Sequence, residues 1–105
     1  MLQSGMDLAA LFGPGGALAR VRSAWEPRPP QEEMAGAVWN SLEKGSDLVV
    51  EAGTGVGKSL AYLLASALWA ATRDRRVIVS THTRALQEQL LQHELPTTAR
   101  ALELL

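Results

Sequence analysis

The chain has 105 residues, of which 47% are hydrophobic and 20% charged, a composition typical of a folded domain. Its net charge of −1 excludes the polybasic surface of a small nucleic-acid-binding module. The absence of cysteine excludes a disulfide, a thiolate zinc site and an iron–sulfur cluster within these residues. The longest apolar run, residues 60–71, is shorter than the ~20 residues that cross a membrane. Because the first residues also lack a basic signal-peptide start, we expect a cytoplasmic protein without membrane association.

Two clusters of helix-breaking residues divide the first part of the chain. Gly-Pro-Gly-Gly occupies residues 13–16 and Pro-Arg-Pro-Pro occupies residues 27–30, with a short helix predicted between them over residues 17–25. We therefore interpret residues 1–30 as an N-terminal approach segment. Residues 31–105 are interpreted as the first part of a larger domain.

The first clear helix is predicted from Gln31 to Lys44, where apolar residues recur at helical spacing and Gly45 follows as a stop signal. A short β-prone run, residues 47–51, predicts a buried strand that ends at a glycine-rich turn. Residues 60–71 are apolar nearly all round, which predicts a helix packed on several sides.

A second buried strand is predicted over residues 77–80, and an amphipathic helix over residues 83–95. Pro96 is expected to end that helix. Its predicted inward residues are Leu86, Leu90, Leu91 and Leu95, and its predicted outward residues are Gln87, Glu88, Gln92 and Glu94. The alternation of strands and helices favours a parallel α/β sheet, although two strands are too few to complete one.

The residues between the first strand and the apolar helix carry the chemistry. Residues 52–59 read Ala-Gly-Thr-Gly-Val-Gly-Lys-Ser, the phosphate-loop pattern with alanine at its first position. Glycines let successive backbone N–H groups point at phosphate oxygens, and Lys58 adds a mobile positive charge. The hydroxyl of Ser59 suits Mg²⁺. A chance match of this kind is the alternative, and the flanking strand and helix make it rare.

Three blocks in order resemble the DinG/XPD-like helicases of superfamily two. Residues 51–64 resemble motif I, residues 25–34 the segment that precedes it, and residues 77–91 motif Ia. The resemblance covers residues 8–96. It implies a partial RecA-like P-loop NTPase domain with parallel strands and flanking helices. It also implies ATP-dependent movement along single-stranded DNA, 5′ to 3′.

The resemblance assigns roles to individual residues. It implies that Lys58 and Ser59 are catalytic and that Ser59 binds the magnesium ion. Thr81 and Thr83 are implied to hold DNA phosphates, and Thr83 as an ordinary helix N-cap is an equally weighted reading. Gln31 is implied to pair with adenine, against the alternative that it merely begins a helix. The implied ATP-binding residues are Arg28, Gln31, Gly53, Thr54, Gly55, Val56, Gly57, Lys58 and Ser59.

Several family features do not occur in this sequence. It contains no Asp-Glu-x-His box, no cluster cysteines and no second motor domain, all of which follow motif Ia in the family. We therefore expect these residues alone to be inactive, the full-length motor to be monomeric, and any iron–sulfur cluster to lie downstream. The alternatives are a stand-alone P-loop nucleotide-binding fragment and a small P-loop kinase. Packing is the expected role of Trp25, Trp39 and Trp69, and a solvated turn that of Arg73, Arg75 and Arg76.

Overall fold

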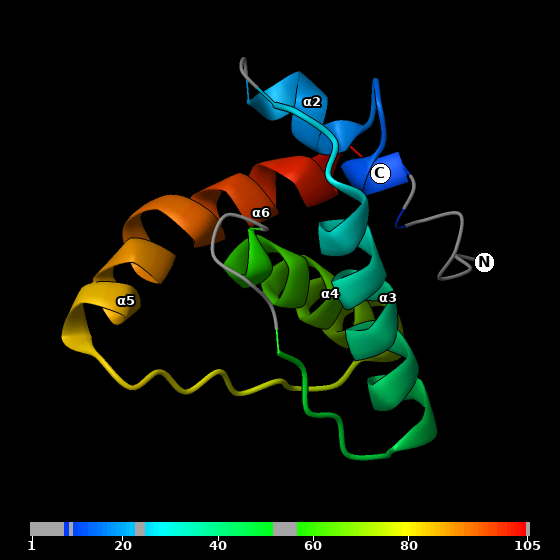
Figure 1. Cartoon of the computed structure of the whole chain (residues 1–105), viewed down its shortest axis with the longest axis vertical. Helices are drawn as coiled ribbons and strands as arrows, with labels where there is room; N and C mark the ends of the chain where they lie inside the picture. The colour runs from blue at the N-terminus through cyan, green and yellow to red at the C-terminus, as the bar shows by residue number, and fades with distance from the viewer. Residues whose placement is uncertain (1–7, 9, 23–24, 52–56, 105) are drawn as a thin grey trace.

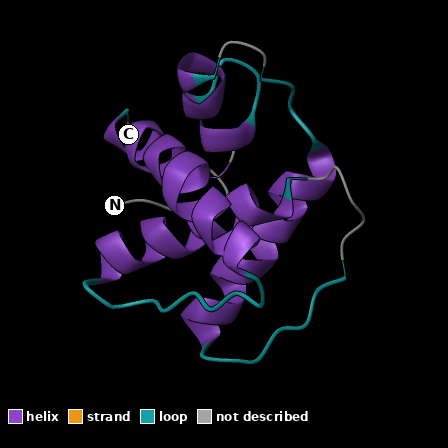
Figure 2. Cartoon of the chain, turned by 90° about the vertical axis from the view of Figure 1, so that its left-hand side faces the viewer, coloured by secondary structure: helices purple, strands orange, loops and turns teal. Residues whose placement is uncertain are grey.

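The structure, a computed structural model, describes residues 8, 10–22, 25–51 and 57–104. All regular secondary structure in these residues is helical, and the helices pack into one body (Figures 1 and 2). The elements are α2 (Ala17–Val21), α3 (Pro29–Lys44), α4 (Lys58–Arg73), α5 (Arg84–Gln89), the π-helix η1 (Leu90–Glu94) and α6 (Leu95–Glu103). No helix in the described ranges is long and apolar enough to cross a membrane.

Helix α3 begins and ends where its sequence signals predict. Pro29 and Pro30 occupy its first two positions, where a missing backbone N–H costs nothing. Gly45 follows the last residue in the left-handed conformation (φ 66°), and its N–H bonds to carbonyls of the final turn. The predicted helix over residues 31–44 is thus confirmed and begins two residues earlier.

Helix α4 lies against α3 and forms the centre of the core (Figure 1). Its buried residues lie on several sides, as the nearly uniform apolar run predicted. They are Leu60, Ala61, Leu63, Leu64, Ala65, Ser66 and Leu68. Arg73, in the last turn, forms an ion pair with Glu43 and lies 5.5 Å from the ring centroid of Trp39. Arg73 therefore joins α4 to α3, which corrects its predicted place in a solvated turn.

Residues of the N-terminal approach segment lie in the core. Leu11, Phe12 and Leu18 are each no more than 1% exposed and pack in the same cluster as Leu64. The indole Nε1 of Trp25 donates to the carbonyl oxygen of Phe12 at 3.3 Å, which holds the chain that leads into α3 against this layer. Trp39 is 2% exposed, and Trp25 and Trp69 pack on the cluster, so the predicted packing role of all three tryptophans is confirmed.

The two strands predicted over residues 47–51 and 77–80 do not form in the described part of the chain. Both segments run as extended, unpaired backbone, and Val49 is 96% exposed and Ile78 92% exposed. The prediction was wrong because a strand requires a neighbouring segment to accept and donate its backbone hydrogen bonds. Two isolated parallel strands cannot supply a sheet with both faces covered.

The last helix continues past Pro96, which corrects the predicted stop. Pro96 lies at the start of α6, directly after the π-helix η1. The N–H of Leu95 bonds to the carbonyl of Leu90, five residues back, and this wider turn makes room for the proline ring. The Oγ1 of Thr97, the residue after the proline, donates to the His93 carbonyl at 2.9 Å.

The extra residue in the π turn also rotates the faces of this helix. Leu90 is buried as predicted, but Leu91 is 58% and Leu95 40% exposed. Glu94, predicted to face outward, is 8% exposed and forms an ion pair of 3.5 Å with Arg22. The α-helical period used for the prediction therefore failed from the π turn onward.

Candidate functional site

The N-terminus of α4 is built from Gly57, Lys58 and Ser59, the last three residues of the phosphate-loop pattern. Gly57 is the N-cap residue, in the left-handed conformation (φ 72°, ψ 41°), and no side chain caps the helix. Lys58 is exposed and Ser59 half-buried. Unpaired N–H groups and the helix dipole at such a terminus attract an anion. The described part of the loop therefore presents the donors that a phosphate group requires.

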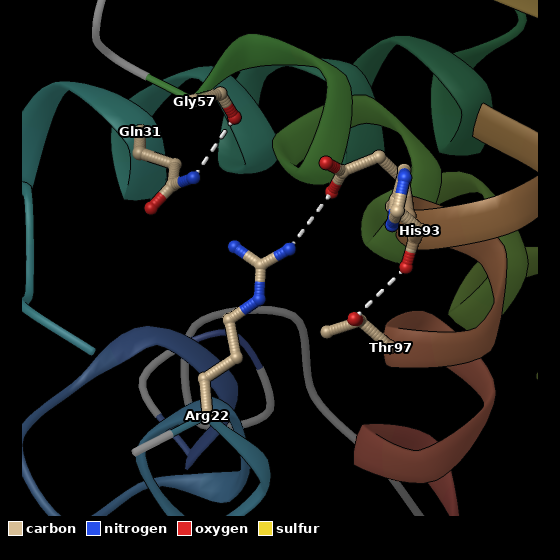
Figure 3. Close-up of polar contacts among 6 residues, drawn as sticks. Arg22, Gln31, Gly57, His93 and Thr97 are labelled. Atoms are coloured by element: carbon tan, nitrogen blue, oxygen red, sulfur yellow. Dashed lines mark hydrogen bonds and ion pairs between the residues drawn. The ribbon is translucent and has the colours of Figure 1, made fainter. Parts of the chain in front are cut away.

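Gln31, in the first turn of α3, contacts the same glycine. Its Nε2 donates to the carbonyl oxygen of Gly57 at 2.8 Å, and Figure 3 shows the two groups facing each other. The Gln31 side chain is buried, with 2% of the residue exposed. Its Oε1 has no hydrogen-bond partner among the described residues. The sequence placed Gln31 near ATP but gave no sign of this bond, which spans 26 positions of the chain.

The remaining predicted ATP-binding residues divide into two groups. Arg28 precedes α3 as its N-cap residue and is exposed, and its carbonyl accepts the N–H groups of Gln31 and Glu32. The other group comprises Gly53, Thr54, Gly55 and Val56, which lie outside the described residues. The structure thus brings Gln31 to Gly57 and leaves the middle of the loop undescribed.

Thr81 and Thr83 meet each other at the start of α5. The Oγ1 of Thr83 accepts the N–H of Leu86 at 3.1 Å, so Thr83 caps the helix. The Oγ1 of Thr81 donates to the Thr83 carbonyl at 3.4 Å. Thr83 is exposed, and the start of α5 lies at the left edge of the molecule in Figure 1, well apart from the start of α4. The capping role is confirmed, and contact with DNA stays a prediction.

A groove of about 610 Å³ adjoins Thr81. One wall is the extended segment 77–81, and the other consists of side chains from α4, α5, η1 and α6, of which all but one are leucines. The helical side chains that line it are Leu63, Gln87, Leu90, Leu91 and Leu95. The segment 77–80, predicted as a buried strand, therefore lines this groove, and none of its residues is buried.

No group of three or more histidine, aspartate or glutamate side chains is placed to hold a metal ion within the described ranges. Ser59 is therefore the one predicted metal ligand that the described residues offer. A single hydroxyl is a weak Mg²⁺ site by itself, since the ion prefers six oxygen ligands and usually takes several from phosphates and water. Magnesium would reach this terminus together with a phosphate ligand.

Comparison with known proteins gives a consistent result. The sequence profile of the DEAD/DEAH box helicases matches residues 30–99. The ATP-dependent DNA helicase YoaA of Escherichia coli is 51% identical over 92 residues, which are 88% of this chain and 14% of that protein. The ATP-dependent helicase DinG of Mycobacterium tuberculosis is 54% identical over 69 residues, which are 66% of this chain and 10% of that protein.

A more distant match is the 3′-5′ exonuclease DinG of Staphylococcus aureus, 39% identical over 75 residues, which are 71% of this chain and 8% of that protein. The chain thus spans no more than 14% of the length of these curated relatives. No solved structure matches.

Proposed function

We propose that this chain, which belongs to the DEAD/DEAH box helicase family, is the ATP-binding part of a DinG-type DNA helicase. The observation that carries the proposal is the phosphate-loop pattern 52–59, which leads through left-handed Gly57 into the uncapped N-terminus of α4. The family implies a RecA-like P-loop domain. In this proposal, the helices that the structure describes are part of such a domain.

Each residue of this terminus has a chemical task in the proposal. The first N–H groups of α4 and the backbone of the glycine-rich loop hold the phosphates of ATP, and Lys58 neutralises charge on the β- and γ-phosphates. Ser59 contributes one oxygen to the Mg²⁺ ion that accompanies ATP. A lysine about 4 Å from one phosphate charge contributes roughly 4 kcal/mol at an effective dielectric constant near 20.

Arg28 and Gln31 are proposed to lie near the adenine. The unpartnered Oε1 of Gln31 supports this, because the exocyclic amine of adenine is a hydrogen-bond donor. In the complete protein, hydrolysis would drive movement along single-stranded DNA, with Thr81 and Thr83 holding strand phosphates. A cytoplasmic, monomeric motor is the form we expect.

The test is Lys58→Ala in the protein expressed from its complete reading frame. We expect loss of DNA-stimulated ATP hydrolysis and of strand unwinding, because the triphosphate loses its main side-chain charge partner. Lys44→Ala is the matched control, because Lys44 is an exposed lysine at the C-terminal end of α3. This variant should retain the wild-type rates of ATP hydrolysis and unwinding. Wild-type turnover in Lys58→Ala would contradict the assignment.

A further inference from the structure

Helix α5 begins at the threonines of the proposed DNA contact and projects from the core. It has no buried residue, and its main contact is with η1, the π-helix that follows it. Thr83 caps α5, and the Oγ1 of Thr81 donates to the Thr83 carbonyl, so both threonines are tied to the start of this helix. The direction of α5, and with it the position of the two threonines, therefore depends on how η1 is held.

The π-helix η1 is held at its two ends by side chains of different kinds. At its first residue, Leu90 is 5% exposed and lies with Leu63 of α4 in the wall of the apolar groove. At its last residue, Glu94 is 8% exposed, and its Oε2 lies 3.5 Å from Nη2 of Arg22, the residue that follows α2 (Figure 3). Two anchors at opposite ends of one turn fix its direction, whereas a single anchor would let it rotate.

Arg22 is itself fixed to the core of the molecule. Its N–H donates to the Leu18 carbonyl at 2.9 Å, and its own carbonyl accepts the N–H of Trp25 at 3.3 Å. Leu18 is 0% exposed, and the indole of Trp25 bonds to the Phe12 carbonyl. The N-terminal approach segment thus presents the Arg22 guanidinium to η1 from a backbone that is bonded on both sides.

The space between Arg22 and α5 is open. A depression of about 590 Å³ lies there, and the residues of α5 that line it are Ala85, Glu88 and Gln89. An open depression beside a helix without buried residues leaves room for that helix to move. The Arg22–Glu94 ion pair therefore ties α2 to the turn from which α5 projects.

We propose that Arg22 and Glu94 are positioning residues for the DNA contact: their ion pair fixes the π turn to the N-terminal approach segment and so sets where α5 holds Thr81 and Thr83. The inference rests on the proposed function for its ligand. Neither charged side chain has to touch DNA in this role. Removal of Arg22 leaves the buried Glu94 carboxylate without its partner, which favours a turn that carries the carboxylate into water.

The experiment measures the Kd of single-stranded oligothymidylate for the protein from its complete reading frame, by fluorescence anisotropy. Glu94→Gln keeps the shape of the side chain and removes its charge. Electrostatics alone predicts tighter binding by this variant, because a negative charge is removed from a protein that binds a polyanion. The positioning role predicts the opposite, a Kd raised roughly fivefold.

Arg22→Met should raise the Kd by a similar factor and leave its salt dependence unchanged, because a positioning residue releases no counterion from DNA. Arg20→Met, at an exposed arginine of α2, is the matched control for the loss of a positive charge and should bind as the wild type does. The double variant Arg22→Glu with Glu94→Arg restores an ion pair of opposite polarity and should recover the affinity that each single variant loses.

Three results would overturn the proposal. One is unchanged or tighter binding by Glu94→Gln. Another is a smaller salt dependence in Arg22→Met, which would make Arg22 a direct phosphate contact. The third is an equal loss of ATP affinity measured without DNA, which would reduce the ion pair to a general structural contact. If the single variants do not fold, the double variant decides, and weak DNA binding by it would refute the proposal.

A measurement without DNA separates this proposal from the proposed function. Hydrogen exchange at the Leu95 amide, which bonds to the Leu90 carbonyl in the π turn, should be faster in Glu94→Gln than in the wild type. The amides of residues 34–44 in α3 should exchange at the wild-type rate. Unaltered exchange at Leu95 would refute the positioning role. Unchanged DNA affinity in Thr81→Val with Thr83→Val would instead refute the threonine contact and leave the exchange result standing.

Discussion

Gly57 and Gly36 would meet different surroundings if each were given a methyl group. At Gly57 the Cβ would come within 2.1 Å of Gln31 Nε2, on a backbone with φ +72°. At Gly36, inside α3, the nearest atom is Leu8 Cδ1 at 3.8 Å, an ordinary contact. Only the first glycine is required by the local geometry.

We expect Gly57→Ala to destabilise the chain and Gly36→Ala to stabilise it. The left-handed conformation costs a residue with a Cβ about 1–2 kcal/mol, and the clash with Gln31 adds to that cost. Alanine in place of a mid-helix glycine gains roughly 0.5–1 kcal/mol. Urea unfolding of the two variants measures both differences.

The double variant Gly57→Ala with Gln31→Ala separates the two contributions. Removal of the glutamine side chain relieves the clash and leaves the backbone cost, so the two changes should not be additive. If the unfolding midpoint of Gly57→Ala lay at the same urea concentration as that of the wild type, the conformation described for Gly57 would be wrong.

At the scale of the element, α5 depends on Thr83 for its first turn. The Thr83 hydroxyl accepts the Leu86 N–H, and α5 has no buried residue to hold it in place by packing. Substitution of such a cap costs about 0.5–2 kcal/mol. The same hydroxyl is exposed, and it is thus available to a phosphate group if the proposed DNA contact exists.

We expect the double variant Thr81→Val with Thr83→Val, in the complete protein, to weaken single-strand binding by roughly 1–3 kcal/mol for two lost hydrogen bonds. Because phosphates carry no sequence information, the loss should be equal for unrelated oligonucleotides. The salt dependence should barely change, since neutral hydroxyls release few counterions. Filter binding at several salt concentrations provides the measurement.

Thr81→Ser with Thr83→Ser is the matched control, because serine keeps both hydroxyls. It should bind DNA as the wild type does and keep the cap of α5. If the valine variant bound single-stranded DNA with unchanged affinity, or lost affinity for one oligonucleotide only, the two threonines would have no role beyond capping the helix and packing.

At the scale of the whole molecule, two β-prone segments lie open to solvent. Val49 and Ile78 are the most exposed large apolar residues described, at 96% and 92%. Unpaired backbone beside exposed apolar side chains is a template for pairing with another chain. A polypeptide of residues 1–105 alone should therefore associate with itself as its concentration rises.

We expect Val49→Lys with Ile78→Lys to reduce that association and leave the helical content unchanged, because neither side chain packs in the core. Sedimentation velocity and circular dichroism measure the two properties. Gln87→Lys with Gln89→Lys adds the same charge on α5 and serves as the control. A wild-type polypeptide that stayed monomeric at all concentrations would contradict this prediction.

Local patterns in the sequence predicted the features that depend on neighbours along the chain. Proline at the start and glycine at the end delimit α3, and continuous apolar character predicts α4, because helix hydrogen bonds join residues four apart. The phosphate-loop pattern and the blocks that resemble the family could likewise be recognised in the sequence, because each is a contiguous run of residues. The structure confirms the two helices, and the comparisons confirm the family.

Only the tertiary structure decided the features that join distant segments. The Gln31–Gly57 bond, the Arg22–Glu94 ion pair and the burial of Phe12 leave no periodic trace in the sequence. The predicted strands failed for the same reason, since apolar β-prone residues indicate that a segment should be buried but not whether a partner strand is present. Helices carry their hydrogen bonds within themselves, whereas strands and side-chain ties take theirs from elsewhere in the fold.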